Sequence, residues 1–320
     1  MSDWTGTGTA VTTFTGGGSG IYTLQDIVDM IRYRLNNYEP PYLWLDNELV
    51  YYTNQIFNML CLEGRILEDS FTQSVCQFST VSGIADYLLH SSIIYIKSAK
   101  ISTQETLSLN VAPSVSWAAG DTLTGASSGK TCVVVAKLTN YTYTVKQRTG
   151  AFTLGEVISN GTYTADQGAA YPVFTDSTTN TNFLSKYSTI EMNRYYPSWR
   201  AQPGAQPLRY LLDCNTGYIT LYPTPNDIFI VNMSVIRYPL TQLSSTNMTF
   251  QVPELNPKYV NALVEGVCYM AYQKRGDDTY DPNKSSSHYA QFRKELGMMK
   301  IQNNLNESNQ ATASPVGGFI

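Results

Sequence analysis

The middle of this 320-residue sequence differs in composition and periodicity from the segments on either side of it. Between about residues 103 and 178 the chain is rich in Thr, Ser and Gly. It contains short β-prone runs such as "TCVVVAKL", "YTYTVKQ" and "AAYPVFT". These runs alternate with turn sequences such as "GASSGK", "RTGA" and "SNGT", which predicts a series of short strands. Residues 103–178 are therefore predicted to form an all-β domain, sandwich-like or barrel-like, inserted into a body of another kind.

The segment before this insert has the apolar spacing of helices. Thr23 is suited to cap a helix together with Asp26 three residues later. One face of that helix carries the apolar side chains Leu24, Ile27, Val28, Ile31 and Leu35. After a turn at Pro40-Pro41, a second helix is predicted to be capped by Asp46 and to stop at Gly64. The two helices form an antiparallel hairpin.

Strand patterns flank the insert on both sides. "SVCQFST" and "YLLHSSIIYIKSAKI" precede it, and "PLRYLLDCNTGYITLYPTPND" and "IFIVNMSVIRYPL" follow it. These patterns predict a small antiparallel strand region beside the helices. A short helical stretch is predicted within "FLSKYSTIEMNRYYPSWR".

Two helices are predicted near the end, one from about residue 257 and one restarted by Asp281-Pro282 as cap and first position. The prediction is thus an α+β fold. Its helical-bundle body is discontinuous and consists of residues 21–102 and 179–300. Residues 1–20 are mostly Gly and Thr and predict a flexible N-terminal arm, because they cannot bury enough apolar area to offset chain entropy. Residues 301–320 are polar except at the end and predict an extended C-terminal tail.

The stretch "LTGASSGKTCVVVA" resembles a phosphate-binding loop, with Gly125, Gly129, Lys130 and Thr131 in suggestive positions. The spacing is one residue short, because Thr124 stands where the first glycine belongs. The residues that follow are β-branched and predict a strand, whereas the loop needs a helix N-terminus aimed at phosphate. We interpret the stretch as a hairpin turn. Nucleotide hydrolysis through Lys130 would require that Lys130→Ala abolish a measured ATPase activity.

The residues that usually carry chemistry are scarce. The five cysteines are widely spaced without a Cys-x-x-Cys pair, and we interpret them as reduced core residues. They are Cys61, Cys76, Cys132, Cys214 and Cys268. Only His90 and His288 provide imidazoles, in unrelated contexts, so neither a zinc site nor a catalytic triad is expected. The sequence predicts no catalytic residue, no metal and no cofactor.

Charge and hydropathy limit the partners. The formal net charge of -4 provides no basic surplus for gripping a nucleic acid backbone. No apolar run approaches the ~18 residues that a membrane span needs. The N-terminus has neither the basic region nor the apolar segment of a secretion signal, so synthesis in a cytoplasm is expected.

Two further clusters allow more than one interpretation. In "RGDDTYDP", Asp277, Asp278 and Asp281, with Glu265 upstream, suggest cation binding, but the spacing is not that of an EF-hand and helix capping is favoured. The aromatic cluster Tyr195, Tyr196, Pro197 and Trp199 has the chemistry to stack on a sugar or a base. A core or subunit-interface role is favoured for it, since Tyr and Trp are enriched at interfaces.

Three stretches together carry a family resemblance. They are "YTLQDIVDMIRYRLNN" with "LWLDNELVYYTNQIFNML", "YYPSW" with "PLRYLLDCNTGYITLYPTPND", and "VPELNPKYVNALVEGVCYMAYQKRGDDTYDPNKSSSHYAQFRKELG". In these, about residues 20–102 and 180–300, the sequence resembles the head-to-tail adaptor (connector) proteins of tailed bacteriophages. The insert is similar to small β modules of phage structural proteins. Minimal adaptors lack such an insert, so its role stays open.

The resemblance implies a non-enzymatic virion protein. It implies a ring of about twelve copies between the portal and the tail, closed by repeated heterologous contacts. DNA would pass through its lumen without specific binding. The resemblance also implies that the C-terminal tail docks on the portal protein, with Pro315, Val316, Phe319 and Ile320 as docking residues. The insert would face nozzle or fibre proteins of the tail. For the contacts between subunits we expect Trp44, Tyr195, Tyr196 and Trp199.

An alternative remains open. The protein is then a virion-associated module that binds or hydrolyses a glycan through the β insert. A glycan-binding screen of residues 103–178 separates the two hypotheses, because the adaptor hypothesis predicts no saturable binding.

Overall fold

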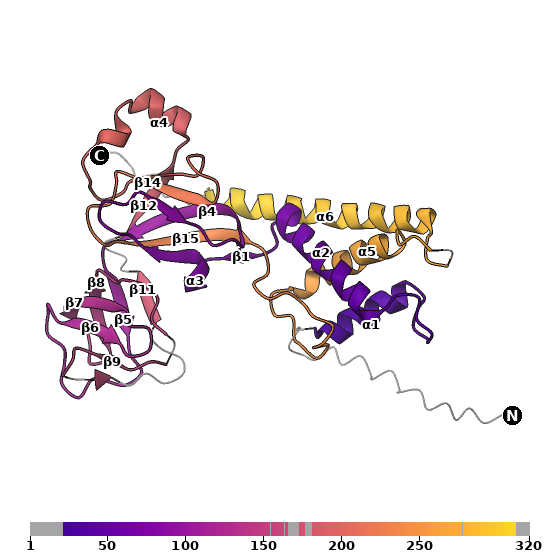
Figure 1. The fold of residues 1–320 in the computed structure, drawn as a ribbon, viewed down its shortest axis with the longest axis horizontal. Coiled ribbons are helices and arrows are strands. Elements are labelled where there is room, and N and C mark those ends of the chain that lie inside the picture. The colour runs from indigo at the N-terminus through magenta and orange to yellow at the C-terminus, as the bar shows by residue number, and fades with distance from the viewer. Residues whose placement is uncertain are drawn as a thin grey trace. The chain divides into compact units, whose positions relative to one another are not determined.

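The computed structural model describes residues 22–311, except residues 154, 163, 166–172, 177–180 and 277. The chain divides into two compact units, Met1–Leu67 with Arg237–Ile320 and Glu68–Ile236. Helices dominate the first unit and strands the second, which confirms the predicted α+β class (Figure 1).

In its described residues, the first unit contains four helices and one 3-10 turn. They are α1 (Leu24–Arg34), α2 (Asp46–Gly64), η2 (Pro257–Tyr259), α5 (Val260–Ala271) and α6 (Pro282–Ala311). Helix α5 packs against α1, α2 and α6, and its side chains from Val260 to Ala271 are almost all buried. Gly266 allows the close approach of α2, since a β carbon there would lie 2.6 Å from Cγ2 of Ile56. The core of this unit is thus centred on α5.

The observed N-terminal caps agree with the caps predicted from the sequence only in part. The Thr23 cap of α1 is confirmed: its hydroxyl accepts from the backbone N of Asp26 at 3.1 Å, and the Asp26 carboxylate accepts from the backbone N of Thr23 at 2.9 Å. Asp46, in contrast, is the first residue of α2 and not its cap. The cap position is Leu45, whose backbone N donates to the Glu48 carboxylate at 3.0 Å. The backbone N of Glu48, which a polar cap would bind, donates instead to Oδ1 of Asn47 at 2.9 Å, so the helix begins without a polar side chain at the cap position.

Helix α6 begins as predicted. The Asp281 carboxylate accepts from the backbone N of Asn283 and of Lys284, each at 3.0 Å. The helix then continues to Ala311, so residues 301–311 are helical and not extended as expected. The amide of Asn303 helps to hold this end, because it donates to the backbone O of Gly64 at 2.7 Å. Polar composition alone did not reveal this contact.

The second unit contains an eight-stranded sheet, in the order β1-β15-β4-β12-β13-β14-β3 with β2 also paired to β15. Its strands are β1 (Glu68–Asp69), β2 (Gln77–Ser79), β3 (Asp86–Leu88), β4 (Ile93–Ser102), β12 (Thr181–Lys186), β13 (Arg209–Leu211), β14 (Tyr218–Tyr222) and β15 (Ile230–Arg237). Helix α3 (Gln73–Cys76) precedes β2. The pair β12–β13 is parallel, whereas β1–β15, β2–β15, β4–β12, β13–β14 and β3–β14 are antiparallel, so the expectation of an antiparallel region is corrected at β12–β13.

The helical stretch predicted from residue 183 starts later. Residues up to Leu184 pair with β4, Ser185 and Lys186 pair with β13, and α4 (Thr189–Tyr195) begins after Ser188. The Ser188 hydroxyl accepts from the backbone N of Glu191, whose carboxylate accepts from the backbone N of Ser188 in return. The capping box therefore marks where the strand pattern gives way to the helix.

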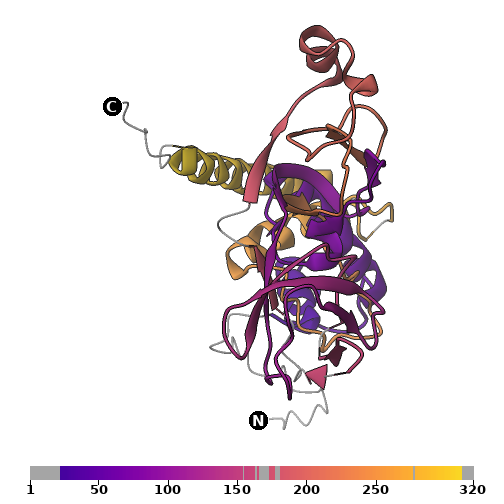
Figure 2. The same cartoon turned by 90° about the vertical axis from the view of Figure 1, so that its left-hand side faces the viewer.

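A second, seven-stranded sheet has the order β10-β9-β6-β7-β8-β5-β11, with every pair antiparallel. Its strands are β5 (Glu105–Ser108), β6 (Thr122–Gly125), β7 (Thr131–Lys137), β8 (Thr142–Lys146), β9 (Ile158–Ser159), β10 (Thr164–Ala165) and β11 (Val173–Asp176). It has a hydrophobic core of its own around Trp117, Tyr143 and Val145, and its strands are seen from the side in Figure 2. That residues 103–178 fold as an independent inserted domain stays a prediction.

Within the second unit, a buried ion pair joins the two sheets. Arg148 lies just after β8, and its guanidinium donates to the Glu105 carboxylate at 2.7 and 3.0 Å. Gln77 of β2 contacts both of these side chains and also Asn232 of β15. The link is polar, buried and hydrogen-bonded on several sides, which is the condition under which a buried charge pair is tolerated.

Candidate docking surfaces

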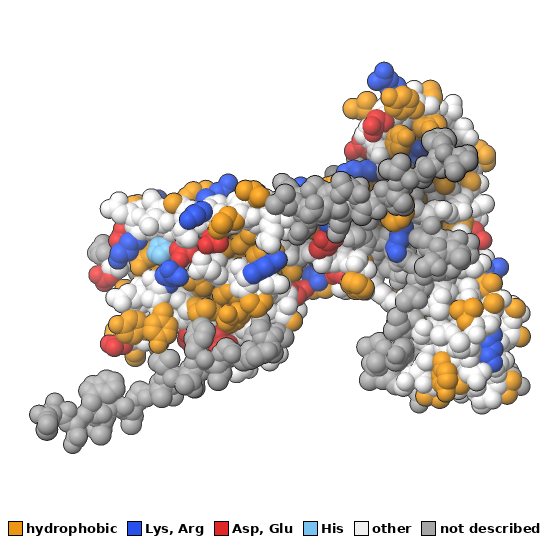
Figure 3. Space-filling view, turned by 180° about the vertical axis from the view of Figure 1, so that it is seen from behind, with side chains coloured by type: hydrophobic (Ala, Val, Ile, Leu, Met, Phe, Trp, Pro, Cys, Tyr) orange, Lys and Arg blue, Asp and Glu red, His pale blue; other side chains and the backbone are white. Residues whose placement is uncertain are grey.

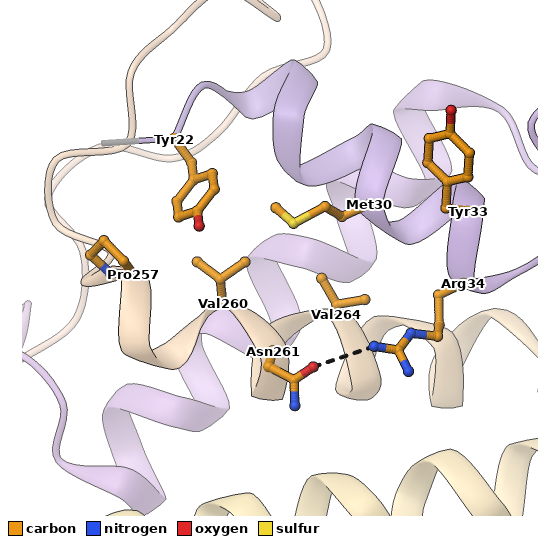
Figure 4. A pocket seen from close by; sticks show the side chains of 8 residues that line it. All are labelled: Tyr22, Met30, Tyr33, Arg34, Pro257, Val260, Asn261 and Val264. Carbon is orange, nitrogen blue, oxygen red and sulfur yellow. Dashed lines mark hydrogen bonds between the residues drawn. The ribbon is translucent and has the colours of Figure 1, made fainter. Parts of the chain in front are cut away.

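A groove between α1 and α5 forms a concave surface of the first unit. It has a volume of about 520 Å³ and is mostly apolar, with Arg34 and Asn261 as its polar members (Figure 4). Its lining residues are Tyr22, Met30, Tyr33, Arg34, Pro257, Val260, Asn261 and Val264. The shape and lining are those of a binding site for an apolar side chain with one anionic group nearby.

Arg34 is held in place by a buried carboxylate. Glu265 of α5 accepts from Arg34 Nη1 at 3.0 Å, and its other oxygen lies 2.6 Å from Nδ1 of His288 on α6. The imidazole of His288 stacks on the ring of Tyr272. One buried carboxylate thus connects three helices and orients the guanidinium at the end of the groove. The 23-residue separation of Glu265 and His288 explains why the sequence did not reveal this pair.

Two of the suggested acidic residues have separate roles in the described part of the chain. Glu265 pairs with Arg34 and His288, Asp281 caps α6, and Asp277 lies outside the described residues. Among the residues that the structure places, no group of three or more His, Cys, Asp or Glu side chains is arranged to hold a metal ion.

A second surface lies on residues 187–201, the first part of the connection between β12 and β13, which contains α4 and η1 (Trp199–Ala201). Figures 1 and 2 both show this connection standing away from the eight-stranded sheet. Ile190 is 78% exposed and Tyr195 is 61% exposed. The connection therefore presents apolar side chains to solvent.

The four residues expected at a subunit interface separate into two groups. Tyr195 is exposed, and Tyr196 is half-buried, with its hydroxyl 2.7 Å from Nη2 of Arg209. Trp199 and Trp44 are buried within their own units, at 7% and 1% exposure. Trp199 packs with Met192, Leu211 and Tyr222, and its Nε1 donates to Asn193 at 2.9 Å. The docking residues Pro315, Val316, Phe319 and Ile320 lie outside the described residues.

Exposed tyrosines that sequence reasoning did not single out lie around the end of α1. Tyr33 and Tyr38 stack with ring centroids 5.8 Å apart, and the guanidinium carbon of Arg32 lies 3.8 Å from the ring centroid of Tyr42. Tyr51 of α2 is also exposed. On the face drawn in Figure 3, hydrophobic side chains lie among Lys, Arg, Asp and Glu side chains. The tyrosine-rich composition was the available signal, but it did not say which tyrosines are exposed.

The loop that resembles a phosphate cradle is a hairpin turn between β6 and β7, as predicted. Its amides are occupied by the protein itself. The buried carboxylate of Glu156 accepts from the backbone N of Ser127 at 2.9 Å and of Ser128 at 2.8 Å. The same carboxylate accepts from the Ser128 hydroxyl and from the backbone N of Thr153. An internal anion thus fills the place that a phosphate would need.

We expect Glu156→Gln to lower the free energy of unfolding by about 2 kcal/mol, because hydrogen bonds to a charged acceptor contribute roughly that much. A glutamine amide keeps the size of the side chain but points a donor at backbone donors. Chemical denaturation monitored by circular dichroism measures the effect. Ser128→Ala is the control, since it removes the two hydrogen bonds of one hydroxyl, to Glu156 and from the backbone N of Lys130, but keeps the carboxylate and its backbone donors, and it should cost less. Equal stability of Glu156→Gln and the wild type would contradict this role of Glu156.

The cysteines lie where inert thiols are expected. Burial raises the pKa of Cys61 and of Cys132 to about 12, and it raises the pKa of Cys268 as well.

None of the helices in the described part of the chain is both long and apolar enough to cross a bilayer.

Comparison with known proteins gives one family. Residues 135–316 match the family model described as SU10 adaptor protein. The match begins within β7 and includes the 187–201 connection, α5 and α6. No curated protein matches the sequence.

Proposed function

Because the chain belongs to the SU10 adaptor protein family, a family of phage head-to-tail adaptors, we propose that it forms a closed ring between the portal and the tail. The family confirms the resemblance noted in the sequence and identifies the protein as a structural component of the virion. The proposal adds the ring, its approximate size of twelve subunits, and the partner on each face.

The observation that carries the ring proposal is the set of exposed apolar and aromatic side chains on two separate elements. Tyr33, Tyr38 and Tyr51 lie on the helical unit, and Ile190 and Tyr195 lie on the 187–201 connection. A closed ring needs two different complementary patches on each subunit, repeated by rotation. Exposed tyrosines suit such contacts, because they contribute large area at low entropic cost.

For the two faces of the ring we propose separate partners. Residues 312–320, with Pro315, Val316, Phe319 and Ile320, bind the portal protein as an apolar tip, and the insert of residues 103–178 faces nozzle or fibre components of the tail. The glycan-binding alternative receives less support. Trp117 and Tyr143 of the insert are buried against each other and are not available to stack on a sugar.

The proposal is tested by mass photometry of the purified protein, alone and with its cognate portal. We expect a discrete ring-sized complex, alone or only with the portal. A variant truncated after Ala311 should keep the fold and lose the portal complex. Truncation at this point spares the contact of Asn303 with Gly64. The matched control replaces residues 312–314 with Gly and Ser and keeps the apolar tip.

The outcomes separate the parts of the proposal. A protein that stays monomeric in the presence of portal contradicts the ring. A truncated variant that still binds portal contradicts docking through the tip and leaves the ring standing.

A further inference from the structure

The groove between α1 and α5 begins where residues 1–21 join the described chain. Tyr22 lines the groove, and its backbone O accepts from the backbone N of Val252 at 2.9 Å. Thr23 also bridges Gln251. These contacts fix the point from which residues 1–21 continue, next to an apolar surface that no described side chain fills.

The chemistry of residues 1–21 complements that of the groove. The segment has two large aromatic side chains, Trp4 and Phe14, and its one charged side chain is Asp3, directly beside Trp4. The groove has an apolar wall formed by Met30, Val260 and Val264, and one cation at its end. In Figure 4 the Arg34 side chain lies at the end of the groove opposite Tyr22.

Arg34 retains the capacity for a further anion. Its side chain is 49% exposed, although Glu265 holds Nη1 and Asn261 lies 3.4 Å from Nη2. A guanidinium has five N–H donors. The contacts with Glu265 and Asn261 leave some of these N–H groups exposed to solvent. The groove thus has an apolar wall and a guanidinium at its end. A segment with an aromatic ring next to a carboxylate matches both, because the ring packs on the wall and the carboxylate lies beside Arg34.

The segment is long enough to reach. Along α1, Arg34 lies about 18 Å from Tyr22, at roughly 1.5 Å per residue. The chain from Trp4 to Tyr22 spans up to about 60 Å when extended, at roughly 3.3 Å per residue. The sequence "GGGSG" at residues 16–20 can reverse the chain direction, because glycine adopts turn conformations without steric cost.

Attachment at the groove itself favours the chain's own segment over other occupants. A short flexible tether gives an effective concentration in the millimolar range. A free second copy at micromolar concentration cannot compete unless its affinity is about a thousandfold higher.

We propose that the groove binds residues 3–14 of the same chain, with Trp4 against Met30, Val260 and Val264 and with Asp3 beside Arg34. The docked segment covers the apolar surface of the groove in the single subunit. This inference is independent of the adaptor role, because it concerns only one chain.

The test uses the fluorescence of Trp4 in the full-length chain. The other three tryptophans, Trp44, Trp117 and Trp199, are buried, so Trp4 is separated from them by subtracting the signal of a Trp4→Phe variant. We expect Trp4 to be protected from acrylamide, with a quenching constant about tenfold lower than that of a synthetic peptide of residues 1–16. This fold-change corresponds to nearly complete docking under the tethered concentration.

Two methionine variants locate the site. Met30→Glu places a carboxylate on the groove wall and should raise the quenching constant to the value of the peptide. Met298→Glu is the matched control, because Met298 is exposed on α6 and does not line the groove; it should leave Trp4 protected. Asp3→Asn should weaken the protection by a smaller factor. Circular dichroism checks that each variant is folded.

Each other result overturns the proposal. If the quenching constant of Trp4 equals that of the peptide, Trp4 is not docked. Trp4 that stays protected in Met30→Glu is buried elsewhere. Protection that disappears on about a hundredfold dilution identifies a second copy as the occupant in place of the chain's own segment.

Discussion

Replacing Glu105 with alanine is expected to lower the free energy of unfolding by about 3–5 kcal/mol, the typical cost of leaving one buried charge without its partner. Arg148 and Glu105 are both almost fully buried, and the guanidinium donates twice to this carboxylate. After the substitution, Arg148 keeps its hydrogen bonds to the Gly150 carbonyl and to the Gln77 side-chain oxygen. These neutral acceptors do not compensate a buried cation.

Chemical denaturation of the full chain measures this loss, and hydrogen exchange locates it in β5 and β8. The double variant Glu105→Gln with Arg148→Met should be more stable than either single variant, since it removes both charges together. Glu68→Ala is the exposed control. It breaks the pair of Glu68 with Lys97 near the surface and should cost at most about 1 kcal/mol. A loss at Glu105 no larger than at Glu68 would refute the buried-pair argument.

The same pair shows what the sequence could not reveal. The insert, the hairpin turn after β6 and the caps of α1 and α6 rest on neighbouring residues, and local patterns predicted the hairpin and both caps correctly. Glu105 and Arg148 are 43 residues apart in the sequence, and they meet only because β5 pairs with β8. No local pattern encodes such a contact.

The docking surfaces likewise depend on contacts between residues that are distant in the sequence. Aromatic composition indicated contact surfaces, but the exposure of each ring depends on the fold around it. Trp199 is buried because β13 and β14 supply Leu211 and Tyr222 against it, whereas Tyr195, four residues earlier, is exposed. The groove combines α1 with α5, more than 200 residues later, so the sequence could place its two walls only on separate predicted helices.

Trp44→Ala is expected to lower the free energy of unfolding of the single subunit by about 3–5 kcal/mol, the usual cost of removing a buried aromatic side chain. The indole is 1% exposed and packs edge-on against Tyr272, and its Nε1 donates to the backbone O of Ala271 at 3.0 Å. Alanine leaves a cavity and removes the indole hydrogen bond to this carbonyl, which keeps the longer bond from the backbone N of Lys274. Trp44→Phe should cost less, about 1–2 kcal/mol, because the ring is kept and only the hydrogen bond and part of the volume are lost.

The comparison with Tyr195 decides between a core role and an interface role for Trp44. Tyr195→Ala should change the unfolding free energy of the subunit by at most about 0.5 kcal/mol, as is usual for exposed positions. If Tyr195 lies in a ring contact, the same variant should weaken the ring in mass photometry while the monomer stays equally stable. Trp44→Ala should show the reverse, with a less stable monomer. A Trp44→Ala monomer as stable as the wild type, combined with a weakened ring, would assign Trp44 to the subunit interface, because a side chain that supports the core cannot be removed without cost to the isolated subunit.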